Sequence, residues 1–380
     1  MSEVQGNDEV NADVNHDEID AAMQAAWEAL EVGNVQKART AAGEILAHWP
    51  VAAAEIAMLQ AACDREEGHF ESALARLAEA AKSDPEWATP ELWMAEILSE
   101  SPEGQAEALR HAKRAVDLAE EEDEFLGALG CKAAIELELG RLAEARKTLA
   151  ELPPAEVPLA DPVVALEFVH LLIEAEAPAE ARARLGVLTE NHPAYADAWY
   201  LRGVLADMEG DGDTRTTSWV KTRELDLSEI DAEGGEGDGQ GHEGEGEGEG
   251  QGPTEGHTHD EDCVHLTEAE LAEVAEETLA TMPEELRGRL AGIPILVADI
   301  PAAVDVQGGT DPRALGLFHG ATHAESGADP ALTQILLFRK NIERVAHDRE
   351  SVRDEVRTTL LHEAGHFFGL DEAALERLGI

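Results

Sequence analysis

Apolar residues recur at helical spacing through the first part of the chain. From about Glu18 to Glu224 the sequence is rich in alanine, leucine, glutamate and arginine, and its apolar positions return every three or four residues. That period predicts amphipathic helices, each of which buries one face. Glycines and prolines interrupt the pattern at intervals, so we expect many short helices rather than a few long ones.

A loose repeat of about 35 residues organises these predicted helices. Each copy has a glycine turn between two helices, a small residue about five positions later and a proline that opens the next unit. Small alanines let paired helices approach closely, so that each pair buries its apolar face on the next pair. The copies run Gly33–Pro50, Gly68–Pro85, Gly140–Pro153 and Ala181–Pro193, and a more divergent copy with Trp93 and Ala106 fills residues 92–125.

This arrangement resembles the tetratricopeptide repeat over roughly 200 residues. The resemblance implies an all-α helical-repeat solenoid over residues 17–224, whose concave face binds a protein partner or substrate. An irregular helical bundle is the alternative that the degenerate motifs leave open.

The composition changes completely over residues 225–264. Acidic residues alternate with glycine there, and no lysine or arginine occurs between Arg223 and Arg287. Such a segment cannot bury a core and repels itself, so we expect a disordered acidic linker; the acidic tail of residues 1–16 is expected to be disordered as well. The linker would hold a partner bound on the repeats close to the second domain.

The end of this linker is rich in histidine, a composition that can bind metal. A solvated polar segment is the simpler interpretation, because no spacing there matches a rigid zinc site. The residues concerned are His242, His257, His259, Cys263 and His265.

The last segment, residues 265–380, mixes helical and strand patterns. Its first amphipathic helix is predicted to open at Thr267, with Glu270 as the acidic partner of a capping box. A leading helix, a small sheet and a long helix near the end predict a small α+β domain. The predicted helices span residues 268–282, 283–286 and 350–368, and the predicted strands span 293–299, 314–319 and 334–338.

The charge of the chain is extreme. Its 380 residues include 81 acidic and 28 basic ones, which give a formal net charge of −53. Nucleic acids and anionic membrane surfaces would repel such a protein, so neither is expected as a partner. The hydrophobic content of 43% is high enough for folded cores.

Cysteine usage and the N-terminal sequence bear on the compartment. The three cysteines are odd in number and far apart, so a reducing compartment is expected rather than a disulfide framework. Neither a signal peptide nor an apolar run of membrane-spanning length is visible. We therefore expect a cytoplasmic protein, whose oligomeric state the sequence does not predict. The cysteines are Cys63, Cys131 and Cys263.

The long final helix carries the clearest chemical motif, His362-Glu363-Ala364-Gly365-His366. Two histidines four positions apart on a helix project from one face, so both imidazoles can reach one metal ion. This is the spacing of zinc hydrolases, in which the glutamate acts as general base. A pair of ordinary polar residues, or a structural metal site without turnover, are the alternatives.

A third zinc ligand is expected after the helix. Gly369 can end the helix, and the chain then turns back towards the metal. Glu372 lies ten residues after His362 and is the predicted third ligand, with Asp371 as the alternative. Two further residues, His323 and Arg339, are candidates for stabilising an oxyanion, although a surface role fits either residue.

Residues of roughly 266–380 resemble the small bacterial zincin-like metallopeptidases, whose members carry a C-terminal His-Glu-x-x-His-x-x-Gly-x-x-Asp motif. The closest match is the segment Thr359 to Leu370, and Glu372 stands where the family usually has aspartate. The resemblance implies a zincin fold, bound Zn²⁺ and peptidase activity.

The sequence therefore predicts a zinc-dependent metallopeptidase with a repeat domain that recruits a protein partner or substrate. Two alternatives stay open: a scaffold protein whose C-terminal domain is catalytically inactive, and a zinc amidohydrolase that acts on small molecules.

Overall fold

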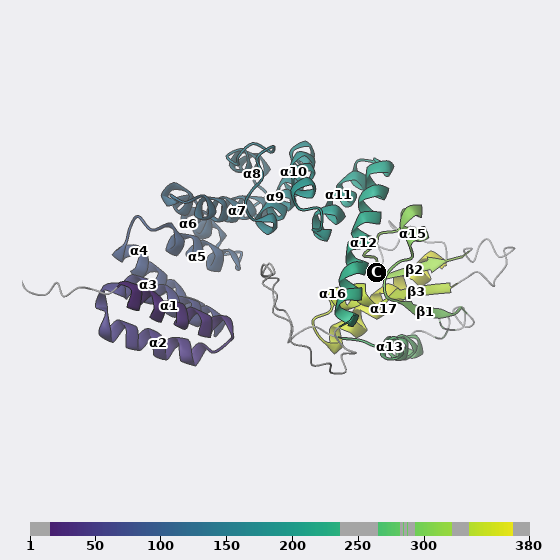
Figure 1. Ribbon diagram of the computed structural model, residues 1–380, viewed down its shortest axis with the longest axis horizontal. Coiled ribbons are helices and arrows are strands. Elements are labelled where there is room, and N and C mark those ends of the chain that lie inside the picture. Colours follow the sequence, from purple (N-terminus) through teal and green to yellow (C-terminus); the bar gives the residue numbers. More distant parts are fainter. Residues whose placement is uncertain are drawn as a thin grey trace, which may run out of the picture. The chain divides into compact units, whose positions relative to one another are not determined.

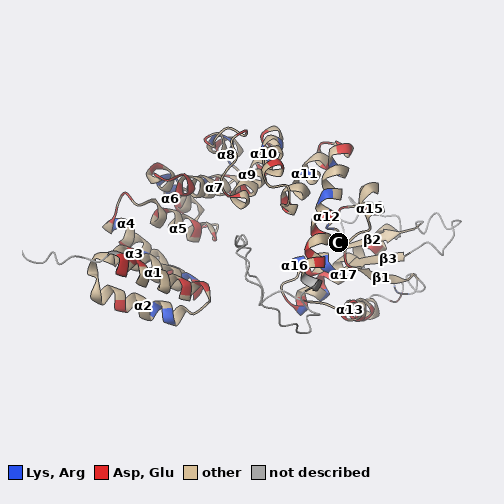
Figure 2. Ribbon diagram, in the orientation of Figure 1, with Lys and Arg blue, Asp and Glu red and all other residues tan. Residues whose placement is uncertain are grey.

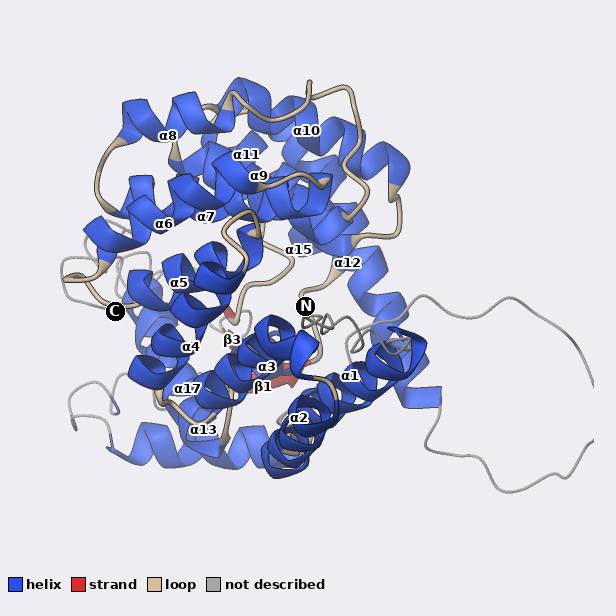
Figure 3. Ribbon diagram, turned by 90° about the vertical axis from the view of Figure 1, so that its left-hand side faces the viewer, coloured by secondary structure: helices blue, strands red, loops and turns tan. Residues whose placement is uncertain are grey.

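The computed structural model describes residues 16–235, 265–281, 293–320 and 334–367, together with residues 284 and 287. Its contacts divide the chain into two compact units (Figure 1). We call Met1–Asn191 the repeat unit and His192–Ile380 the C-terminal unit. Among the described residues, the repeat unit contains helices but no strands, and all the strands lie in the C-terminal unit (Figure 3).

The repeat unit is a succession of paired helices, as the sequence predicts. Buried alanines line the contacts between the helices, where their small side chains permit close approach; Ala38, Ala73 and Ala145 are all 0% exposed. The helices are α1 (His16–Glu31), α2 (Val35–His48), α3 (Ala53–Glu66), α4 (Phe70–Ser83), α5 (Ala88–Ser99), α6 (Gln105–Leu118), α7 (Glu122–Glu138), α8 (Leu142–Leu149), α9 (Pro162–Glu174) and α10 (Pro178–Asn191), with a short 3₁₀ helix, η1 (Pro50–Ala52), before α3.

The turns between paired helices share one backbone conformation. Gly33, Gly68 and Gly140 have φ angles of 71°, 72° and 68°, in the left-handed region where glycine carries no steric penalty. Glu176 takes the same conformation at φ 54° between α9 and α10, a place where the sequence has no glycine to signal the turn. Gly210, at φ 75°, repeats it once more, so the two helices after the repeat unit form another pair of the same kind.

The C-terminal unit begins with that pair, α11 (Ala196–Met208) and α12 (Gly212–Gly235). Residues 225–235 are thus helical, although the sequence places the acidic linker there. The rest of that predicted linker, residues 236–264, lies outside the described residues, as do the N-terminal tail up to residue 15 and most of the predicted helix 283–286. The remaining elements are α13 (Glu268–Thr281), β1 (Ile295–Ala298), α15 (Ala303–Gly308), β2 (Gly316–His319), β3 (Gln334–Phe338), α16 (Arg339–Val345) and α17 (Arg349–Phe367).

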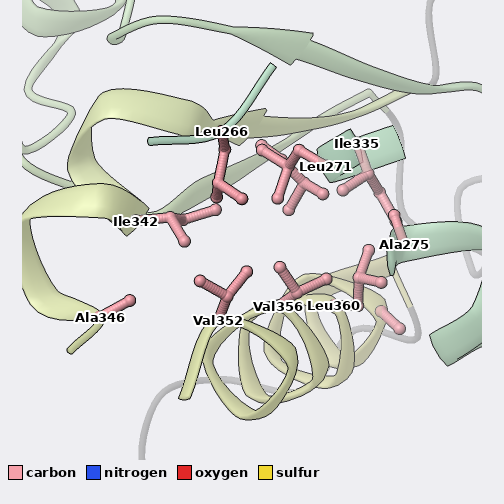
Figure 4. Packing of buried hydrophobic residues seen from close by; sticks show 11 residues of the cluster. Leu266, Leu271, Ala275, Ile335, Ile342, Ala346, Val352, Val356 and Leu360 are labelled. Carbon is pink, nitrogen blue, oxygen red and sulfur yellow. The ribbon is translucent and has the colours of Figure 1, made fainter. Parts of the chain in front are cut away.

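The three strands form one sheet in the order β1-β3-β2. The central strand β3 pairs in parallel with β1 and antiparallel with β2, so β2 is an edge strand. The apolar face of α17 packs against α13 and the sheet: Figure 4 shows Val356 and Leu360 facing Leu271 and Ile335. This core places α17, and with it the histidine motif, alongside the edge strand β2.

The predicted fold class, a helical-repeat region combined with a small α+β domain, is confirmed. All three predicted strands are present, and the capping box at the start of α13 is formed. The backbone N–H of Glu270 donates to the hydroxyl of Thr267 at 3.2 Å, and the N–H of Thr267 donates to the Glu270 carboxylate at 2.9 Å.

Candidate metal centre and repeat groove

The two histidines of the motif point their rings at one another from α17. The Nε2 atoms of His362 and His366 are 3.1 Å apart, and their ring centroids are separated by 4.7 Å. Zinc–nitrogen bonds of about 2.0–2.1 Å at a tetrahedral angle separate two ligand nitrogens by about 3.3–3.4 Å. The two imidazoles therefore lie within a few tenths of an ångström of the spacing that one zinc ion requires.

Glu363 lies beside this pair and is buried, with 7% of its surface exposed. Its Oε2 accepts a hydrogen bond of 2.6 Å from the backbone N–H of Phe318, on the edge strand β2. A carboxylate buried against a strand keeps a fixed orientation when one of its oxygens is held in this way. The bond fixes Oε2 of Glu363 and so sets the orientation of the carboxylate beside the two histidines.

The edge strand approaches α17 closely enough to require glycine. A Cβ at Gly316 would lie 2.5 Å from Cγ2 of Thr359 and 3.3 Å from Cγ of Glu363. Glycine is thus needed at this position for its small size, because it allows β2 to run alongside the motif. Neither Gly316 nor the Phe318 N–H was predicted as part of the site, although a glycine inside a predicted strand can signal a close backbone approach.

The remaining predicted site residues separate into two groups. Asp371, Glu372 and His323 lie outside the described residues, so the third ligand stays a prediction. Arg339 is described, and its guanidinium contacts Asp299, Glu343 and the backbone carbonyl of Leu266. Those contacts tie α16 to the loop after β1 and to the start of α13, which is a structural role.

One other group of ligand-type side chains lies close together among the described residues. Asp64, Glu67 and His69 have ligand atoms within 4.8 Å of one another. Arg39 and Arg76, however, both form ion pairs with Asp64, and Arg39 also pairs with Glu67. These contacts lower the pKa of Asp64 in spite of its burial. The group is accounted for as an ion-pair network between helices.

The repeat unit carries a groove of about 510 Å³ on α5, α7 and α9, the first helices of three successive pairs. Its apolar wall includes Leu126, Ile135 and Phe168. Gly127 and Gly130 lie in the middle of α7, where each costs roughly 0.5–1 kcal/mol relative to alanine, and both line the groove. Their missing side chains leave room for neighbours, since a Cβ at Gly127 would lie 3.5 Å from Cδ2 of Leu92 and one at Gly130 would lie 3.6 Å from Cζ of Phe168.

Carboxylates surround this groove. Glu96, Glu138 and Glu167 line it, one from each helix. Burial raises the pKa of the Cys131 thiol within the groove to about 12, with the charges of Glu96 and Glu138 adding to the effect. Acidic residues also outnumber basic ones over the unit as a whole (Figure 2). The groove is therefore apolar inside and carries carboxylates at its edges, of which Glu96 also pairs with Arg65 at 3.1 Å.

Several solved structures are similar to part of this chain. The Pseudomonas aeruginosa protein pilF is 20% identical, and the match covers 57% of this chain and 98% of that one, with a TM-score of 0.43. PilW, a type IV pilus biogenesis factor, is 14% identical over 54% of this chain and 92% of its own, with a TM-score of 0.42. A tetratricopeptide-repeat protein of Thermus thermophilus is 16% identical over 47% of this chain and 94% of its own, with a TM-score of 0.37.

No curated protein matches this chain. Among the described residues, no helix combines the length and the apolar character needed to cross a membrane. The C-terminal sequence does match a known family, over the region that contains the sheet and α17. The predicted resemblance is thereby confirmed: residues 290–380 are similar to the zincin-like metallopeptidases.

Proposed function

We propose that this protein is a zinc-dependent metallopeptidase whose repeats bind the protein partner or substrate. The observation that carries the proposal is the pairing of the His362 and His366 Nε2 atoms at 3.1 Å, next to a buried glutamate that a backbone N–H orients. His362 and His366 would hold Zn²⁺ together with Glu372, or with Asp371 in its place.

The chemistry divides between the ion and the side chains. Bound zinc lowers the pKa of a coordinated water to near neutrality and polarises the substrate carbonyl. Glu363, oriented by the backbone N–H of Phe318, would take a proton from the attacking water on its carboxylate and then pass that proton to the leaving amine.

The test is zinc content and peptide cleavage by the full chain. Glu363→Gln should retain about one zinc per chain and lose cleavage by about 10²-fold or more. Asp354→Asn is the matched control, since Asp354 is an exposed carboxylate on the same helix and should leave both readouts unchanged. Cleavage that survives in Glu363→Gln, or the absence of zinc from the purified wild type, contradicts the proposal.

The competing function is a scaffold that binds zinc without cleaving peptides. Its support is the groove, which could serve partner binding alone. Stoichiometric zinc in the wild type together with no cleavage of any member of a broad peptide library would favour the scaffold over the peptidase.

For the repeats we propose a partner segment with an apolar anchor flanked by lysine or arginine. The apolar wall of the groove would bury the anchor, and Glu96, Glu138 and Glu167 would attract the basic residues. Association should weaken with added salt, because exposed charge pairs are screened.

An array of leucine- and phenylalanine-centred peptides with basic or acidic flanks tests this partner chemistry. Basic peptides should bind, and the triple variant Glu96→Lys, Glu138→Lys, Glu167→Lys should weaken them at least about tenfold. The control triple Glu79→Lys, Glu144→Lys, Glu190→Lys changes the net charge equally on exposed positions of α4, α8 and α10. An equal loss of peptide binding in both triple variants would mean that only net charge matters and would refute the groove as the binding site.

A further inference from the structure

The helical pair α11–α12 shares a buried ion-pair cluster with the sequence that follows the acidic segment. Asp226 of α12 is 1% exposed. Its two carboxylate oxygens accept from Arg313, at 3.1 and 3.3 Å, and from Arg344, at 3.2 Å. A buried carboxylate is tolerated only where such partners neutralise it. The carboxylate of α12 and the two arginines that follow the acidic segment therefore neutralise one another.

The helical pair supplies three of the contacts of Arg313. Besides Asp226 it contacts Asp197 of α11 at 2.6 Å, and its guanidinium lies 4.7 Å from the ring centre of Tyr200. The hydroxyl of Tyr200 in turn donates to Asp311 at 3.0 Å. Asp197, Tyr200 and Asp226 thus hold the segment just before β2, although all three precede it by more than 80 positions.

Further contacts extend along α12. Arg223 donates from Nε to the carbonyl of Pro301 at 2.6 Å. Gly309 follows the last residue of α15 and has a φ angle of 104°. The guanidinium of Arg215 contacts it so closely that a Cβ at this position would lie 2.8 Å from Nη2 of Arg215. In Figure 1, α12 lies beside α15. The ends of the acidic segment 236–264 consequently belong to one unit.

The cluster leads directly to the edge strand. Arg313 lies three residues before Gly316, the first residue of β2. Buried Asn341 of α16 donates to the carbonyls of Pro312, at 3.0 Å, and Ala314, at 2.7 Å, and so holds the same segment from the other side. The strand that begins there places the Phe318 N–H on Glu363.

We infer that α11 and α12 are an integral part of the metallopeptidase unit and that Asp226 and Arg313 are positioning residues for Glu363, acting through residues 312–315 and β2. The peptidase unit then begins near His192 rather than after the acidic segment. The part of this inference that concerns Glu363 rests on the proposed function; the part that concerns assembly does not.

The first test cuts the full chain within the acidic segment. Residues 243–249 are replaced by the recognition site of a sequence-specific protease, and the cleaved protein is analysed by gel filtration. The two fragments should co-elute, and Asp226→Asn should separate them or reduce their association at least about tenfold. Separation of the wild-type fragments would overturn the inference, because it would mean that the segment joins two independent parts.

The second test measures the site in the uncut chain. Asp226→Asn should speed hydrogen exchange in residues 312–320 at least about tenfold and lower kcat by about tenfold, with KM and zinc content unchanged. The control is Asp207→Asn, which removes an Arg-paired but exposed carboxylate from the same helical pair. Exchange unchanged in Asp226→Asn overturns the positioning role even if the protein has no peptidase activity.

A second variant distinguishes a local effect on β2 from misfolding of the whole unit. Arg313→Gln removes the link to β2 but leaves Arg344 to neutralise Asp226. It should produce the same local increase in exchange over residues 312–320. Uniformly faster exchange across α13 and α17 in a folded Arg313→Gln protein would indicate general destabilisation instead and would count against a positioning role.

Discussion

The backbone N–H of Phe318 and the carboxylate of Glu363 are joined by a hydrogen bond of 2.6 Å between an edge strand and the motif helix. The two residues are 45 positions apart, and one of them contributes only its backbone. The orientation of the proposed general base therefore depends on where β2 lies. Gly316, at the start of that strand, allows the close approach on which the bond depends.

Phe318→Pro removes the donor while leaving the zinc ligands intact. Position 318 points its N–H at α17, so proline should spare the ladder between β2 and β3. Loss of a hydrogen bond to a charged group costs about 1.5–3 kcal/mol, which corresponds to a fall in kcat of about 10- to 150-fold. Phe318→Ala keeps the N–H and is the control. Equal kcat values in the two variants would show that the bond does not matter for turnover.

Gly316→Ala tests the close approach itself. The new Cβ would overlap Cγ2 of Thr359 and crowd the carbonyl of Leu336, so we expect a loss of about 1–3 kcal/mol in the free energy of unfolding. Gly308→Ala, which meets nothing within 4 Å, should be nearly neutral. Thr359→Ser in the Gly316→Ala background should restore part of the loss in urea unfolding. No rescue would assign the damage to Leu336 instead.

Much of the fold could be predicted because turn glycines and the spacing of apolar residues are visible in short stretches of sequence. The left-handed turns at Gly33, Gly68 and Gly140 coincide with glycines, and the apolar face of α17 follows helical spacing. The turn at Glu176 has no such signal, and it is fixed by the packing of α9 on α10.

The boundary at residue 224 illustrates what local signals miss. Asp226 is one more acidic residue in an acidic stretch and is expected to be solvated, yet it is 1% exposed. Its partners, Arg313 and Arg344, are 87 and 118 positions away, so nothing nearby in the sequence reveals the burial. The His362–Glu363–His366 geometry was predictable for the opposite reason, since one helix supplies all three residues.

Because of the capping box of α13, we expect the stability of the C-terminal unit to fall as the pH is lowered through the acidic range. Hydrogen bonds from the backbone and hydroxyl of Thr267, with a smaller effect of Arg349, lower the pKa of Glu270 to about 2. A carboxylate whose pKa falls on folding stabilises the fold above its unfolded pKa of about 4.3, and that contribution disappears as the pH drops towards 2. Glu270→Gln should therefore lower the urea midpoint at pH 6, and the difference from wild type should shrink between pH 5 and pH 2.

The control for that prediction is Glu273→Gln, an exposed position on the same helix outside the capping contact. It should shift the urea midpoint little at any of these pH values. A pH-independent difference between Glu270→Gln and wild type would mean that the capping carboxylate is not the group that titrates.

The third zinc ligand can be settled by two amide substitutions. Glu372→Gln should raise the dissociation constant for zinc by more than about 100-fold, because an amide oxygen lacks the charge that a His₂Glu site uses to neutralise the ion. Asp371→Asn, one position earlier, should leave zinc affinity within about threefold of wild type. Competition with a chelator of known affinity measures both. The reverse order of effects would make Asp371 the ligand, and a modest loss in each would mean that the two carboxylates substitute for one another.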